Sequence, residues 1–263
     1  MAKLISINGA AKGEVKLPAV FRASYRPDLI QRAVLASQSK RRQPYGRDPL
    51  AGQRTSASYY GVKDERGTMK NREMARGKRS VGGNPGQEMR GRFNPQSKGG
   101  RKAHPPKAEK IFALKINSKE IALALASAIA ATADAELVKA RGHRIDGVAV
   151  PIVAENAIEA LKKAKDVEMF LRALKLDAEM ERASQKKVRA GRGKMRGRKY
   201  RTKTSVIFII AEDKGIGKAA CNLPGVEVAN LDSLTVESLA PGGTAGRLAV
   251  WSEGAIKKLS EMK

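Results

Sequence analysis

Residues 40–107 are the stretch that most limits how this chain can fold. Within it, 18 Lys and Arg residues stand against 5 Asp and Glu, a net charge of +13, together with 11 of the chain's 25 glycines. Large aliphatic or Phe side chains are few: Leu50, Val62, Val81 and Phe93. Such a stretch cannot bury enough apolar surface to offset the entropy lost on ordering. We therefore expect an extended basic internal loop over residues 46–103, inserted in a globular domain. A loop this long is normally functional or disordered.

The rest of the positive charge is concentrated in a second stretch, residues 186–203. It contains 10 Lys and Arg residues and no acid, so the two stretches hold +23 of the chain's net +26. The other 177 residues carry only +3. This distribution predicts a near-neutral body with two basic appendages. Charge of this kind indicates a polyanionic partner, either nucleic acid or an anionic membrane surface.

The membrane alternative is disfavoured by the second stretch itself. Gly191, Gly193 and Gly197 interrupt the amphipathic helix that a membrane-surface segment needs, and no lipidation motif is present. The most apolar run, residues 121–131, is too short to span a bilayer. The N-terminus lacks the apolar run of a signal peptide, and the single cysteine, Cys221, fits a reducing compartment. We expect a cytoplasmic protein with no membrane partner.

Outside the basic stretches the patterns are those of a globular α/β domain, formed by residues 1–45 and 104–263. A hairpin is expected around Asn8-Gly9, between residues 3–7 and 14–17. Further strands are expected at residues 148–153, 205–210, 226–229 and 248–251, the second of them buried on both faces. Strands that alternate with helices predict a mainly parallel sheet covered by helices.

The helices are predicted from apolar spacing and caps. The first helix follows Pro27, has residues 40–42 in its last turn, and carries an apolar face formed by Leu29, Ile30, Ala33 and Val34. The second runs to about Thr132, and its apolar face is formed by Ile121, Leu125, Ala128 and Ile129. Asn117 with Glu120, Thr235 and Ser252 are candidate caps. Further helices are expected at residues 158–161, 167–174, 177–188, 214–220 and 252–259.

Gly215-Ile-Gly-Lys-Ala-Ala220 has the G-x-G-x-x-A pattern of a dinucleotide-binding turn after a strand. This leaves open an alternative function, a nucleotide-dependent enzyme on a doubly wound body. The ordinary alternative is a strand-to-helix turn with glycines for close packing. His104 and His143 lack partners at metal-binding spacing, and no nucleophile is paired with a base. We therefore expect no catalytic residue, no metal and no cofactor.

Several motifs along the chain resemble one family. Tyr45-Gly-x-Asp48, Ala51-Gly-x-Arg-Thr55, KGGRKAHPPK at residues 98–107, ATADA at 131–135, Ala190-Gly-x-Gly-x-x-Arg-Gly-Arg-Lys-Tyr200, Leu239-Ala-Pro-Gly-Gly243 and Gly246-Arg-Leu248 occur in order. They resemble universal large-subunit ribosomal protein four, archaeal and eukaryotic branch. The chain lacks the long C-terminal extension of the eukaryotic members, which favours an archaeal type. Residues 63–92 depart from the family's usual tunnel-tip sequence.

The resemblance implies a three-layer α/β domain and a structural constituent of the large ribosomal subunit. It implies a protein that binds ribosomal RNA early in assembly and lines the peptide exit tunnel with its loop. Its partners would be large-subunit ribosomal RNA, other large-subunit proteins and the nascent polypeptide.

Arginine forks match phosphate geometry, and aromatic rings can stack on bases. The expected RNA-binding residues are Arg41, Arg42, Tyr45, Arg47, Arg54, Arg66, Arg72, Arg76, Lys78, Arg79, Arg90, Arg92, Lys98, Arg101, Lys102, His104, Arg189, Arg192, Lys194, Arg196, Arg198, Lys199, Tyr200 and Arg201. The expected tunnel residues are Arg66, Met69, Lys70, Arg72 and Arg76.

Overall fold

The chain forms two compact units in a computed structural model that describes residues 2–65, 68–81, 85–86, 88–145 and 147–261. Unit 1 comprises Met1–Lys40 and Leu114–Lys263, and unit 2 comprises Arg41–Ala113. The basic loop expected at residues 46–103 lies within unit 2. Unit 2 extends further at both ends, by 5 residues on one side and 10 on the other.

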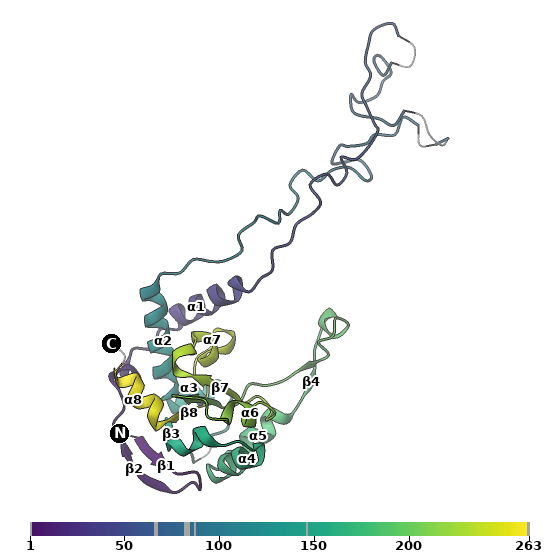
Figure 1. Cartoon of the computed structure of the whole chain (residues 1–263). Coiled ribbons are helices and arrows are strands. Elements are labelled where there is room, and N and C mark those ends of the chain that lie inside the picture. The colour runs from purple at the N-terminus through teal and green to yellow at the C-terminus, as the bar shows by residue number, and fades with distance from the viewer. Residues whose placement is uncertain (1, 66–67, 82–84, 87, 146, 262–263) are drawn as a thin grey trace. The chain divides into compact units, whose positions relative to one another are not determined.

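Unit 1 is built on a six-stranded sheet with the strand order β2-β1-β3-β8-β6-β7 (Figure 1). Only β1 and β2 pair antiparallel, as the predicted hairpin, and the other neighbours are parallel. The mainly parallel α/β sheet is therefore confirmed. The strands are β1 (Ala2–Ile5), β2 (Ala11–Val15), β3 (Ile152–Ala154), β6 (Ile207–Ile210), β7 (Glu227–Asn230) and β8 (Ala249–Ser252). A separate two-stranded sheet pairs β4 (Lys187–Val188) with β5 (Tyr200–Arg201).

Helices cover both faces of the sheet, which gives unit 1 three layers. The helices are α1 (Pro27–Lys40), α2 (Ser118–Thr132), α3 (Ala135–Ala140), α4 (Ala164–Ala173), α5 (Asp177–Ser184), α6 (Ile216–Ala220), α7 (Val236–Leu239) and α8 (Glu253–Glu261). One hydrophobic cluster joins the sheet to α1, α2, α7 and α8, and a second joins it to α3, α4 and α6.

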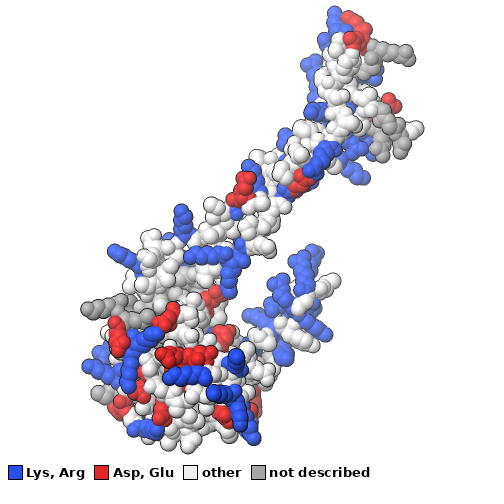
Figure 2. Space-filling model, in the orientation of Figure 1, with Lys and Arg blue, Asp and Glu red and all other residues white. Residues whose placement is uncertain are grey.

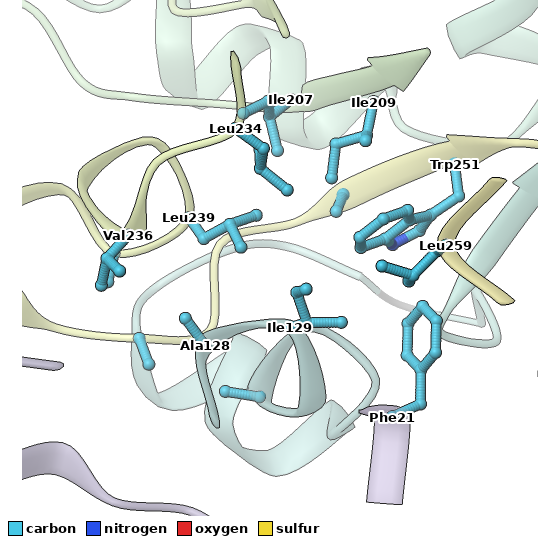
Figure 3. Close-up of a cluster of buried hydrophobic side chains, with 14 of the residues drawn as sticks. Phe21, Ala128, Ile129, Ile207, Ile209, Leu234, Val236, Leu239, Trp251 and Leu259 are labelled. Atoms are coloured by element: carbon cyan, nitrogen blue, oxygen red, sulfur yellow. The ribbon is translucent and has the colours of Figure 1, made fainter. Parts of the chain in front are cut away.

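Strand β6 is the point where the two clusters meet. Alternate side chains of a strand point to opposite faces of its sheet. Ile207 and Ile209 accordingly join the first cluster, while Phe208 and Ile210 join the second. All four residues are buried, which confirms a strand buried on both faces. In the first cluster the fully buried Trp251 of β8 meets the edge of Phe21, with ring centroids 5.1 Å apart (Figure 3).

The caps that the sequence predicts hold the helix ends. The Asn117 N–H donates to Glu120 at 3.4 Å, so the start of α2 has the predicted acid-to-amide contact. Thr235 Oγ1 accepts from the Ser238 N–H at 3.2 Å, and Ser252 Oγ accepts from the Ala255 N–H at 3.1 Å. Each bond satisfies an amide that has no partner within its own helix.

Several predicted boundaries are wrong. Helix α1 ends at Lys40, before residues 41 and 42. Helix α5 ends at Ser184, because Lys187 already pairs with Arg201 in the β4–β5 ladder. Residues 156–160 form a 3-10 helix, and β3 begins only after Pro151, which has no N–H to give to a ladder. Ile121 is 37% exposed, because the buried face of α2 is centred on Ala124, Ala128 and Ala131.

Removal of unit 2 should leave unit 1 folded. The Leu114 N–H donates to Ser39 Oγ at 2.9 Å, so the two ends of unit 1 meet where unit 2 begins and ends. Replacement of residues 41–113 by a short Gly-Ser linker is expected to preserve one cooperative thermal transition and the near-ultraviolet dichroism of the buried Trp251. A product without that transition would show that unit 1 depends on unit 2 for its packing.

Candidate nucleic-acid interface

The second basic stretch folds as a hairpin, here called the arm (residues 186–203), which projects from unit 1 (Figure 1). Its stem pairs Lys187 with Arg201 and Val188 with Tyr200. Two glycines turn the chain at the tip, Gly191 and Gly197, and both have a φ of +79° that L side chains rarely adopt. A short 3-10 helix, Arg192–Lys194, lies between them. The glycine spacing that excluded a long helix therefore builds a turn.

The arm presents its cations to solvent without acidic partners among the described residues. Its predicted RNA-binding side chains are exposed except for one, Arg189: they are Arg192, Lys194, Arg196, Arg198, Lys199, Tyr200 and Arg201. Figure 2 shows the arm as a run of Lys and Arg. Arg189 is half-buried and donates from Nε to the Arg198 carbonyl at 3.1 Å, so it braces the hairpin. Tyr200 is 50% exposed, and the Lys199 ammonium lies 5.5 Å from its ring centre.

In unit 2, two extended limbs run side by side in opposite directions. The Arg47 N–H donates to the Pro106 carbonyl at 3.0 Å. A Cβ at Gly46 would meet the backbone of Ala108, and one at Gly52 would meet the carbonyl of Gly100. Glycine therefore allows the limbs to lie closer together than side chains would permit.

Beyond the limbs, unit 2 is held by its own polar contacts. Arg79 forms isolated β-bridges to Ser58 and Gly91, and its guanidinium donates to the carbonyls of Met89 and Ala75 at 3.0 and 3.1 Å. Met69 is only 4% exposed. Arg79 and Met69, both predicted to face a partner, thus also organise the interior of unit 2.

The remaining predicted residues of unit 2 fall into two groups. Those with exposed side chains are Arg41, Arg42, Tyr45, Arg47, Arg54, Arg72, Arg76, Lys78, Arg90, Lys98, Lys102 and His104, and those that are half-buried are Lys70, Arg92 and Arg101. Arg54 pairs with Asp48 within the same limb. Arg66 lies outside the described residues.

Aromatic rings support several of these cations. Tyr45 stacks on Phe112 with centroids 5.4 Å apart, and the Arg42 guanidinium lies 4.5 Å from the Phe112 ring centre. Lys78 lies 4.5 Å from the ring centre of Phe93. Cation–π contacts of this kind hold a charged group in place while it stays accessible. Phe112 was missed by the sequence analysis because no motif marks it.

A buried charge network at the foot of the arm was also missed. Glu179 of α5 is fully buried and accepts from Arg182 at 2.6 and 2.7 Å, from His143 at 2.7 Å, from the Arg144 N–H and from Ser205. Burial would raise the pKa of Glu179, but the hydrogen bonds from Arg182, His143 and the Arg144 amide outweigh it and lower that pKa to about 2. The network ties α5 to the strand that follows the arm.

In the G-x-G-x-x-A turn, a carboxylate of the chain itself accepts from the backbone amides. Asp213 Oδ1 accepts from the Gly215 and Gly217 N–H groups at 2.9 and 3.1 Å, where a dinucleotide phosphate would have to bind. At the carboxyl ends of β6 and β8, the buried Glu159 accepts from the Ala211 N–H and the Ser252 hydroxyl at 2.9 and 2.7 Å. Carboxylates of the chain thus fill the positions that nucleotide enzymes of this fold use for ligands.

Among the described residues, no three His, Cys, Asp or Glu side chains gather in a way that could hold a metal ion. None of the described helices is long and apolar enough to cross a membrane.

Fold and surface together define a basic α/β protein with two extended cationic segments, the arm and unit 2. Comparison with known proteins places this description in a family: residues 15–262 match the model of the ribosomal protein L4/L1 family. The chain is 46% identical to large ribosomal subunit protein uL4 of Methanococcus vannielii, over 98% of each chain. It is 47% identical to that of Methanococcoides burtonii and 46% identical to that of Archaeoglobus fulgidus, over 99% of this chain and 98% of each relative. The chain belongs to the ribosomal protein L4/L1 family, as its motifs predicted.

The Glu179 network predicts a specific dependence of stability on pH. Because the folded-state pKa of about 2 lies below the ordinary value near 4.3, the carboxylate stabilises the fold above that ordinary value and the contribution is lost as pH falls toward 2. Glu179→Gln should cost about 3 kcal/mol at pH 7 and progressively less toward pH 2.5. Urea unfolding at pH 7, 4 and 2.5 measures this. The control is Glu181→Gln, which changes an exposed glutamate on the same helix. An equal loss of unfolding free energy for Glu179→Gln at every pH would contradict this role of the carboxylate.

Proposed function

We propose that this chain is a structural component of the large ribosomal subunit and holds ribosomal RNA with unit 2 and the arm. The observation that carries the proposal is the set of exposed cations on the arm, which have no acidic partner among the described residues. Cations left unpaired in this way suit phosphates, which dominate the affinity of such complexes. The relatives' name, large ribosomal subunit protein uL4, supports the ribosomal assignment. Translation would place the protein in the cytoplasm.

The two segments would have different tasks. The close limbs of unit 2 suit insertion between packed RNA helices, because two closely spaced backbone segments with exposed cations need little space. Its far part, residues 63–92, would line the peptide exit tunnel and face the nascent polypeptide, with Arg72 and Arg76 exposed there. The arm would clamp RNA at the surface, with Tyr200 stacked on a base or ribose.

An early role in assembly follows from the same geometry. A segment enclosed by RNA helices has to be in place before those helices close around it, so the protein would bind ribosomal RNA early. Unit 1 would contact other large-subunit proteins and fix the position of the basic segments. We assign no chemistry to it, because Asp213 and Glu159 occupy the ligand positions of the turn and the sheet edge.

Salt dependence of RNA binding tests this proposal. In duplex-like RNA, log K should fall by about 0.9 per log unit of salt for each phosphate neutralised. Replacement of the four tip cations Arg192, Lys194, Arg196 and Arg198 by Gln should therefore lower the slope by about 3 to 4. Binding of a large-subunit RNA fragment would be measured by filter retention from 50 to 400 mM salt, roughly the range in which phosphate contacts are lost.

The matched control replaces four exposed lysines of unit 1 by Gln, Lys119, Lys163, Lys165 and Lys218. It removes the same charge and should change the slope by less than about 1, if these lysines make no phosphate contact. Equal slopes for the two variants would contradict an interface on the arm.

A further inference from the structure

At the foot of the arm, unit 1 contains a cavity of about 720 Å³. Its walls come from the stem of the arm, from helix α5, from the segment that follows α3 and from the turn that starts at Pro241. Its basic and imidazole side chains are Arg141, His143, Arg182, Lys187, Arg201 and Lys203. No Asp or Glu belongs to the described lining. A cavity with this lining is suited to an anion rather than a metal ion.

Arg141, which follows α3, is the central cation of the cavity wall. Its guanidinium donates to the Thr244 carbonyl, to Thr244 Oγ1 and to the Pro241 carbonyl, all neutral acceptors. Three of its five N–H groups are used in this way, so two remain for a ligand. Desolvation, followed by the nearby charges of Arg247 and Arg182, lowers the pKa of Arg141 to about 10. A half-buried cation of this kind normally has a counter-ion.

The neighbouring groups leave the positive charge uncompensated. Glu179 neutralises Arg182 by accepting from its Nε and Nη2. Lys187 and Arg201 have no acidic partner among the described residues, and Lys203 donates only weakly to the neutral Gln185 amide at 3.4 Å. His143 is 5% exposed, and its Nε2 is buried without a hydrogen-bond partner in the described structure. The cavity therefore combines unpaired cations with an unsatisfied imidazole nitrogen.

We propose that this cavity binds one phosphate group, held by Arg141 with the cations of the arm stem around it. The proposal rests on the proposed function, because the phosphate would belong to the backbone of RNA that lies along the arm. A free phosphate would use the same chemistry, since a guanidinium offers paired N–H donors to either. Such a site would give the arm a fixed point of attachment at its foot, whereas the exposed cations at the tip supply an attraction that salt screens.

Footprinting of arginines with phenylglyoxal on the full chain tests the site without RNA. Labelling rates would be measured by mass spectrometry in inorganic phosphate and in chloride at equal ionic strength. We expect phosphate to slow the labelling of Arg141 by at least about threefold, as a bound anion occupies its free N–H groups. The control is Arg22, an exposed arginine of unit 1 outside the cavity, whose rate should not change. Equal rates for Arg141 in the two salts would overturn the proposal.

A second experiment measures RNA binding and compares Arg141→Gln with Lys165→Gln. The control variant Lys165→Gln removes an exposed charge on α4. We expect the first to weaken binding of the large-subunit RNA fragment about tenfold and to lower the salt slope by about 0.9, and the second to change affinity less than twofold. If Arg141→Gln does not fold, the single variant Lys203→Gln of the cavity wall takes its place with the same expectation. Equal effects of cavity and control variants would overturn the site as an RNA anchor.

The two measurements separate failure of the site from failure of the proposed function. Protection of Arg141 by phosphate in a protein that does not bind the RNA would support a site for free phosphate and contradict the ribosomal proposal. Steep, salt-dependent RNA binding with no protection of Arg141 would leave the ribosomal proposal standing and overturn the cavity as a phosphate site.

Discussion

Charged groups without counter-ions cannot enter an apolar core, and that constraint organises this protein. The cost of burying an unpaired guanidinium or ammonium exceeds what packing returns. The two stretches that hold most of the net charge therefore lie outside the sheet and its helices, as the arm and unit 2. What remains is nearly neutral, and it packs as an ordinary three-layer domain with β6 buried on both faces. The protein thus separates a near-neutral folding part from two strongly basic segments within one chain.

In unit 1, acidic side chains also fill the positions at which open α/β sheets bind ligands. Open α/β sheets bind ligands beyond the carboxyl ends of their strands. Here Glu159 occupies that edge between β6 and β8, and Asp213 takes the amides of the G-x-G-x-x-A turn. Carboxylates of the chain itself therefore take the amide N–H groups and the hydroxyl at these two positions.

Much of the fold could be predicted from local sequence. The apolar run around Phe208 and the caps at Thr235 and Ser252 act within a few residues, so their effect is visible in the sequence. The basic segments were predictable from charge and glycine content. Segment ends were harder to predict, because the β4–β5 pairing that stops α5 joins residues on both sides of the turn.

Side-chain networks at the foot of the arm could not be predicted. Arg141 contacts Thr244, 103 positions away, and Glu179 meets His143 from 36 positions away. Only the folded backbone brings such residues together, and no short motif marks them. Phe112 under Arg42 is hidden for the same reason. The sequence therefore predicts which segments are basic, whereas the structure is needed to find which cations are braced, paired or left unpaired.

We propose that RNA contacts are confined to unit 2, the arm and the foot of the arm. Ultraviolet crosslinking of the full chain to large-subunit RNA, with peptide mapping by mass spectrometry, measures this directly. We expect crosslinks within unit 2, along the arm, including Thr202, and at Thr204 of the cavity wall. Crosslinks that cluster instead on α4, α6 and α8, with the arm unmarked, would contradict it.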